Sequence, residues 1–298
     1  MKKKIYYEYF EEKVLPVIYQ FENYRLKTLR KMILISAVSI FAGIFFAISF
    51  VYISLAHNIF ILMLPIFLFL MYACFIKSIV NIMLTGREYQ NWLLKTLLPY
   101  FFEPVANFKF WPKNQNTEAF INSKLFGNFD TREDLASIFG IYKNTNIILT
   151  NTELKIPVNR VVFRGTTIQL ELTQAINNHI IIISKNAKKI NKFRQINPHV
   201  AEMNKYLYVF AKNKNSLNIV NEDLWKILKR FGELYTAKKM GISIYNKTIL
   251  ICMEQKRPWL FGFLLKSLLS AKNYDDLIER FIVIYDLIDY VNNLSDSV

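Results

Sequence analysis

The chain has 298 residues, with 38 Lys or Arg against 23 Asp or Glu and a formal net charge of +15. Because 53% of the residues are hydrophobic and 15% are aromatic, the composition excludes intrinsic disorder. Only 20% are charged, below the quarter or so that a soluble domain carries, so part of the chain is expected not to face water. Having only two cysteines excludes a disulfide scaffold and a cysteine-rich metal site.

The N-terminal segment, residues 1–31, is predicted to be a cytoplasmic helix. Apolar residues recur every three or four positions between Ile5 and Leu29, which gives the helix one apolar face. Pro16 is expected to interrupt or bend it, so that the first part forms a separate short helix. The apolar face is expected to pack on the cytoplasmic domain or the membrane surface.

An uncharged stretch follows, with no Asp, Glu, Lys or Arg from Met32 to Ile76. It divides into spans at 32–54 and 58–76, each close to the ~20 residues that a bilayer core requires. The sequence therefore predicts a two-helix transmembrane hairpin at 32–76. A cleaved signal peptide is the competing interpretation, and it is disfavoured because a long segment precedes the first span and a second span follows at once.

Basic residues flank both outer ends of this hairpin and are absent from its turn; they are Arg25, Lys27, Arg30, Lys31, Lys77, Arg87 and Lys95. This distribution predicts a multi-pass protein of the cytoplasmic membrane with both termini cytoplasmic. Apart from His57 in the turn, the spans carry no ionisable residue that a transport path could use. The hairpin is therefore interpreted as an anchor.

Residues 77–298 are predicted to form a cytoplasmic α+β domain of antiparallel strands with packed helices, either as one unit or as subdomains 77–212 and 213–298. The predicted helices are 87–102, 117–126, 221–235, 257–270 and 273–294, with Thr117, Asn221 and Asn273 at their starts. The predicted strands are 147–150, 161–164, 167–172, 179–184 and 206–210, followed by a hairpin of 240–245 and 248–253 turning at Asn246 and Lys247.

No catalytic, cofactor-binding or metal-binding residue is predicted. The three histidines and two cysteines are not spaced as metal ligands or as a Cys–His pair. Two carboxylate clusters, Asp130 with Glu133 and Asp134, and Asp275 with Asp276 and Glu279, are expected at helix starts, where they complement the helix dipole. Asp286 and Asp289 are expected on a solvated helix face. A hydrolase with paired carboxylates is not excluded by the sequence, since folding can bring together carboxylates that are distant along the chain.

The basic charge has two interpretations. Lys and Arg can neutralise nucleic-acid phosphates, or they can contact anionic lipid beside the anchor. The lysines are scattered along the chain and the predicted anchor holds the domain at a leaflet, so we expect lipid contact in preference to nucleic acid.

One segment combines basic and apolar residues and is a candidate for the membrane interface. Lys256 and Arg257 precede an apolar run in which Trp259 and Phe261 could enter the interface. The same low polarity suits a helix buried in the domain core, which is the favoured interpretation.

Several short motifs occur in a recognisable order: Leu15-Pro16, Phe21-Glu22 with Arg25, the pair of spans, Ser123-Lys124-Leu125-Phe126, and Phe163-Arg164-Gly165 before a strand. In this order the chain resembles an uncharacterised bacterial membrane-protein family called domain of unknown function 3137. The resemblance implies bacterial origin and a membrane-anchored cytoplasmic domain, and it brings no activity or catalytic residue. Gly165 is expected to permit a positive φ at a turn.

Three functional hypotheses follow from these observations. The first is a membrane-anchored binding or scaffold module whose cytoplasmic domain contacts a protein partner or the anionic leaflet. The second is a membrane-tethered hydrolase or transferase with an unrecognised site. The third is a nucleic-acid-binding protein, which requires the lysines to gather on one face.

Overall fold

The computed structural model divides the chain into two compact units. It describes residues 2–56, 64–96, 100, 109–111, 117–157, 160–186, 193–198, 200–211, 219–255, 267, 269 and 271–295. The sheet unit comprises Met1–Val14, Lys95–Phe261 and Ala271–Val298, and the hairpin unit comprises Leu15–Leu94 and Gly262–Ser270.

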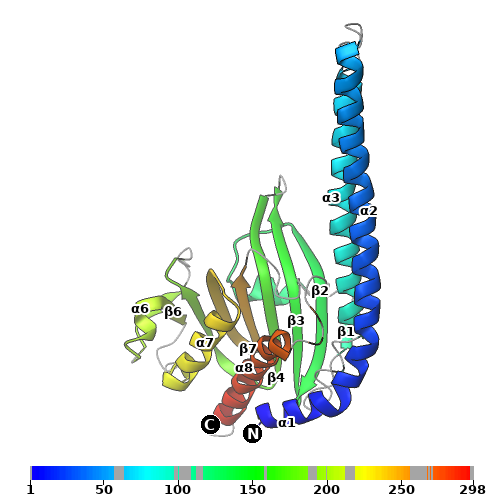
Figure 1. The fold of residues 1–298 in the computed structure, drawn as a ribbon. Coiled ribbons are helices and arrows are strands. Elements are labelled where there is room, and N and C mark those ends of the chain that lie inside the picture. The colour runs from blue at the N-terminus through cyan, green and yellow to red at the C-terminus, as the bar shows by residue number, and fades with distance from the viewer. Residues whose placement is uncertain are drawn as a thin grey trace. The chain divides into compact units, whose positions relative to one another are not determined.

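The sheet unit is built on a seven-stranded sheet in which every pairing is antiparallel (Figure 1). Its strands run in the order β1-β2-β3-β4-β6-β5, and β7 pairs with β4 as well. They are β1 (Lys109–Trp111), β2 (Thr131–Tyr142), β3 (Thr145–Ile156), β4 (Arg160–Ser184), β5 (Arg194–Ile196), β6 (Leu207–Ala211) and β7 (Lys239–Glu254). The long strand β4 lies between β3 and β7 over its first half and between β7 and β6 over its second.

Helices cover both faces of this sheet. On one face lies α8 (Ala271–Ser295), whose five consecutive residues 281–285 are all buried, with α7 (Glu222–Leu234) beside it (Figure 1). The rings of Tyr285 in α8 and Tyr142 in β2 have centroids 4.5 Å apart. The short helix α5 (Glu118–Ser123) covers the other face, where the Tyr245 hydroxyl donates to the Ala119 carbonyl at 3.0 Å. A further short helix, α6 (Met203–Tyr206), precedes β6.

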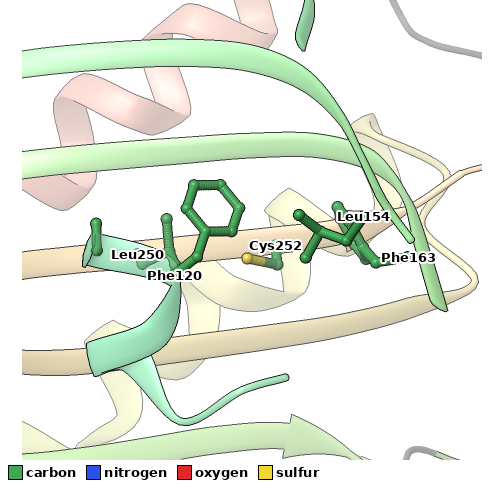
Figure 2. Packing of buried hydrophobic residues seen from close by; sticks show 6 residues of the cluster. Phe120, Leu154, Phe163, Leu250 and Cys252 are labelled. Atoms are coloured by element: carbon green, nitrogen blue, oxygen red, sulfur yellow. The ribbon is translucent and has the colours of Figure 1, made fainter. Parts of the chain in front are cut away.

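A compact apolar cluster fills the space beneath α5. Figure 2 shows Phe120 reaching from α5 toward β7, where Leu250 and Cys252 lie on the same face as Leu154 and Phe163 of the neighbouring strands. The strand register requires this arrangement, because Leu154 is opposite Phe163 and side chains alternate between the two faces of a sheet.

Several sequence predictions are confirmed. Asn221 caps α7, since its side chain accepts hydrogen bonds from the backbone N–H groups of Asp223 and Leu224, both at 3.1 Å. The apolar run from Ile180 to Ile183 is buried at every position, as expected for a strand covered on both faces. The final helix packs on its own domain.

The acidic segment around Asp134 was predicted to begin a helix, and this is wrong. Residues 131–142 form β2, and Asp134 is buried in an ion pair with Arg132, at 2.8 Å. The Thr152 hydroxyl of β3 also donates to Asp134 at 2.9 Å. The Asp134 carboxylate is therefore explained by partners on the sheet and not by a helix dipole.

The predicted hairpin at Asn246 is also wrong. The chain passes through this residue with φ of 49° and continues as one strand, β7, which pairs with β4 on both sides of it. Between Glu171 and Ile180 the longer β4 strand bulges relative to β7. The positive φ that favours Asn in a tight turn here accommodates this bulge.

Two predicted helix caps differ from the structure. Thr117 precedes α5 but its side chain makes no capping hydrogen bond, and α5 ends at Ser123, where Lys124 adopts a left-handed φ of 58°. The final helix begins at Ala271, so Asn273 lies inside its first turn and does not cap it. Asp286 is not simply solvated either, because it accepts a hydrogen bond from Arg230 of α7 at 3.0 Å.

The N-terminal region is helical throughout. The first helix, α1 (Lys2–Tyr9), passes into a π-helix at Phe10–Val14, and α2 (Leu15–Ala56) begins just before Pro16. The separate short helix expected before Pro16 is therefore present as α1, but Pro16 does not interrupt the helix, because it lies in the first turn of α2. Beyond it, the predicted cytoplasmic helix and first span form one continuous helix, and the second long helix, α3 (Leu64–Thr96), likewise joins the predicted second span to part of the helix expected from Arg87 onward.

Candidate functional site

The hairpin unit contains two helices that are long and apolar enough to cross a membrane, by length and composition. Their apolar side chains point outward. The large hydrophobic residues that are more than half exposed include Ile33, Leu34, Val38, Phe41, Phe45, Ile48, Phe69, Ile79 and Met83. A core helix of a soluble protein passes the same composition test, but it would bury such side chains.

Between α2 and α3 the pattern is reversed, because the seam is formed mainly by small and polar residues. Its members on α2 are Met32, Ser36, Ser39 and Gly43, at spacings of four, three and four, and those on α3 are Cys74, Ser78, Asn81 and Thr85, with the same spacings. A Cβ placed on Gly43 would lie 3.5 Å from the Cys74 Cβ, so the helices approach closely there. Small residues at such spacing are typical of helix pairs in membranes.

Hydrogen bonds across the seam fix its register. The Asn81 side-chain amide donates to the Met32 carbonyl at 3.4 Å and to the Ser36 hydroxyl at 3.3 Å. Within α3, the Thr85 hydroxyl donates to the side-chain oxygen of Asn81 at 3.4 Å and so holds the amide in place. Together with the Gly43–Cys74 contact, these bonds define an antiparallel pairing along the part of the hairpin that the structure describes.

At the base of the hairpin, the Glu22 and Arg25 motif residues form a buried ion pair. The Arg25 guanidinium donates twice to the Glu22 carboxylate, at 2.7 and 3.0 Å, and both side chains are less than one-tenth exposed. The Ser267 hydroxyl, from the second segment of the hairpin unit, also donates to Glu22, at 2.9 Å. Such bidentate pairing with an added hydrogen bond compensates for the loss of solvation.

A cluster of aromatic rings lies next to this ion pair. The Trp92 ring lies 4.9 Å from Phe21 and 4.3 Å from Tyr24, and the Tyr24 and Tyr89 rings stack at 6.5 Å. The pKa of Tyr89 is raised, because the effect of burial exceeds the opposing effect of the nearby Arg25 guanidinium. The base of the hairpin is therefore a tightly packed charged cluster shielded by aromatic rings.

The second motif, Phe163-Arg164-Gly165, lies in β4 of the sheet unit. Phe163 belongs to the apolar cluster beneath α5, whereas Arg164 points to the opposite face and pairs with Glu153, which holds the pKa of that carboxyl below its usual range. Gly165 was expected to permit a positive φ at a turn, and this is wrong: it lies within β4, where a Cβ on it would collide with the Met253 carbonyl oxygen. Glycine is required by close backbone approach within the sheet.

A small open pocket of about 120 Å³ adjoins this motif. It is lined by Val161, Val162, Phe163, Arg164, Lys238, Glu254 and Gln255. The lining charges are partly compensated, because Arg164 pairs with Glu153 and Glu254 pairs with Lys239 at 3.2 Å. This pocket brings no pair of carboxylates together.

His179 and Cys252, two potentially reactive residues of the sheet unit, have structural surroundings. The His179 Nε2 lies 2.9 Å from the Ser243 hydroxyl and 3.3 Å from the Ser123 carbonyl, but Ser243 is fully buried within β7. Cys252 is enclosed in the core, where burial raises the pKa of its thiol. Among the described residues, no group of three or more His, Cys, Asp or Glu side chains could hold a metal ion.

The membrane-interface candidates Lys256, Arg257, Trp259 and Phe261 lie outside the residues that the structure describes. Sequence reasoning paired Glu22 and Arg25 only as parts of a motif, and it missed the seam residues and Ser267. The seam did carry a signal, since small and polar residues recur at spacings of four and three within the apolar run.

No family model matches the chain, and no curated protein matches it. Among solved structures, the chain is similar to the crystal structure of the mycobacterial trehalose monomycolate transport factor A, TtfA, at 13% sequence identity with a TM-score of 0.34. The match covers 62% of this chain and 86% of that chain. A likeness this distant says nothing about function.

Proposed function

We propose that the protein is a multi-pass protein of the bacterial cytoplasmic membrane, anchored by α2 and α3 with both termini in the cytoplasm. The observation that carries this proposal is the reversed pattern of the hairpin, with apolar side chains outside and a small, polar seam inside. In water that pattern would expose a large apolar surface. In lipid the outer apolar side chains contact the hydrocarbon chains, and the small and polar side chains of the seam contact each other.

On this proposal, the sheet unit serves as a cytoplasmic binding or scaffold module that contacts a protein partner or the anionic leaflet. Its core is filled by its own helices. Among the described residues, His179 is hydrogen-bonded to Ser243, Cys252 is enclosed in the core, and Asp134 is held in a buried ion pair. The resemblance to the family called domain of unknown function 3137 supports the same layout of an anchor followed by a cytoplasmic domain.

Anchoring is tested by alkaline carbonate extraction of membranes from cells that express the full-length chain. The protein is expected to stay in the pellet, and reporters fused to either terminus are expected to show cytoplasmic activity. Recovery of the protein in the carbonate supernatant would refute the anchor.

The binding role is tested by crosslinking in cells followed by mass spectrometry. One partner crosslinked to the sheet unit at near-stoichiometric yield would support a scaffold. Detection of only self-links and lipid would remove the support for a protein partner and turn attention to chemistry in the sheet unit.

A further inference from the structure

The hairpin register places a charged residue, Lys77, inside the apolar band of α3. Lys77 lies between Cys74, which meets Gly43, and Asn81, which bonds to Ser36. On α2 this level is well past Lys31, the last charge before the uncharged stretch. At 1.5 Å per residue, Lys77 lies roughly 13 Å further along the hairpin than Lys31.

Apolar side chains continue along α3 beyond Lys77, in the direction away from the hairpin turn. Ile79, Met83 and Leu84 are all more than half exposed, although the sequence prediction ended the span at Ile76. A band that ended at Lys77 would leave about 25 Å of α2 before Ala56, which is shorter than a hydrocarbon core of about 30 Å. A core of full thickness reaches the level of Ser36 and leaves Lys77 about one helical turn inside.

The Lys77 side chain is exposed on the outer surface of the hairpin. Among the residues that the structure describes, no carboxylate lies within ion-pair distance of it. A lysine stem spans about one turn and can return its ammonium group to the lipid headgroups. Because a helical side chain starts toward the helix N-terminus, here the hairpin turn, the stem of Lys77 must fold back and its reach is short.

We propose that the Lys77 ammonium binds a phosphate of the lipid headgroups from inside the apolar band and thereby sets the depth of the hairpin. This inference rests on the proposed membrane anchor. The short reach of Lys77 holds the level of Ser36 at the boundary of the hydrocarbon core. The apolar turns between Asn81 and Thr85 stay among the headgroups, although their own surface favours deeper burial.

The test uses a Met83→Cys variant of the full-length protein, reconstituted into phosphatidylglycerol vesicles. The measured quantity is the rate at which a membrane-impermeant maleimide labels this cysteine. Met83 is 69% exposed and lies just beyond Asn81, away from the hairpin turn, so a cysteine at this position is expected to react when Lys77 is present. Adding Lys77→Leu is expected to let the hairpin sink and to slow labelling several-fold. Lys77→Arg is expected to preserve the rate, as is Lys27→Leu, which removes an exposed lysine outside the band.

Unchanged labelling in the Lys77→Leu variant would overturn the inference. An equal slowing in maltoside micelles would also overturn it, because these micelles contain no phosphate. A slowing that occurs in cell membranes but not in vesicles of purified protein would overturn it as well, because it would indicate that Lys77 pairs with an acidic partner helix. Carbonate extraction of each variant separates the two proposals: retained protein with unchanged labelling refutes only the depth-setting role, whereas extracted protein refutes the anchor.

Discussion

At the scale of single residues, the ion pair between Glu22 and Arg25 makes the sharpest energetic prediction. Removing one partner of a buried pair leaves an uncompensated charge and typically costs about 3–5 kcal/mol, whereas replacing both with apolar residues of similar volume is often neutral. We therefore expect Arg25→Ala to lower the free energy of unfolding by several kcal/mol. The double variant with Glu22→Leu and Arg25→Met should return close to wild type.

Denaturant unfolding of the detergent-solubilised chain, followed by tryptophan fluorescence, measures this difference, since Trp92 packs on Phe21, the residue before Glu22. The matched control is Lys4→Ala, which breaks an ion pair with Glu8 at 3.7 Å whose side chains are 83% and 64% exposed. It should change stability little, because exposed pairs contribute little. A single Arg25→Ala variant as stable as wild type would contradict a buried, compensated pair.

Gly165 gives a second prediction at this scale, because its added Cβ would collide with the Met253 carbonyl oxygen. Gly165→Ala must push β4 and β7 apart, and we expect a loss of about 1–3 kcal/mol or more in unfolding free energy. The control has the opposite sign. Gly232 lies within α7 with no neighbouring atom within 4 Å, so Gly232→Ala should stabilise the helix by up to about 1 kcal/mol. Equal stability of the two variants would refute the close approach.

At the scale of elements, the attachment of α1 to α8 predicts a pH dependence. The Tyr7 hydroxyl donates to the Asp275 carboxylate, and this hydrogen bond with burial raises the pKa of Tyr7 to about 12. The unfolded value is about 10, so the contribution to stability is complete below about pH 10 and is lost as the pH rises toward 12.

We therefore expect Tyr7→Phe to be less stable than wild type near pH 8, and the difference in unfolding free energy to shrink between pH 10 and 12. Denaturant unfolding of both proteins across this range measures it. A difference that stays constant with pH would show that the hydroxyl of Tyr7 does not stabilise the fold through Asp275.

Elements were predictable from sequence where the signal was local. The cap at Asn221 is set by the residues that follow it, and the uncharged stretch after Met32 shows helices of membrane-spanning length. The sequence misled where the partner was distant. Asp134 resembles a helix-start carboxylate until Thr152, on another strand, is seen to donate to it.

The same limit applied to the hairpin unit. The sequence prediction ended the second span just before Lys77, since a charge ends an apolar run in sequence. Only the pairing of Asn81 with Ser36 shows that α3 stays level with the apolar part of α2 beyond this lysine. Depth along a hairpin is a property of two helices in register, and neither helix carries that information alone.

At the scale of the whole molecule, the two units follow opposite packing rules. The sheet unit buries apolar residues such as Ile168, Ile251 and Ile284 at its centre, as a protein in water does. The hairpin unit buries Ser36, Ser39 and Ser78 and exposes its large apolar side chains. Judged by the side chains that each unit exposes, the sheet unit is suited to water and the hairpin unit is suited to lipid.

This contrast predicts opposite responses to the same substitution. Phe41 and Phe45 are 70% and 68% exposed on α2, near the middle of the apolar run. An Asp at the centre of a span costs about 2.5–3.5 kcal/mol to insert, so Phe41→Asp with Phe45→Asp should release a large share of the protein into the carbonate supernatant. Ile121→Asp changes a residue that is 54% exposed on α5 of the sheet unit, and it should leave membrane retention unchanged. If the Phe41 and Phe45 variant were retained as fully as wild type, the apolar surface of α2 would not be what holds the protein in the membrane.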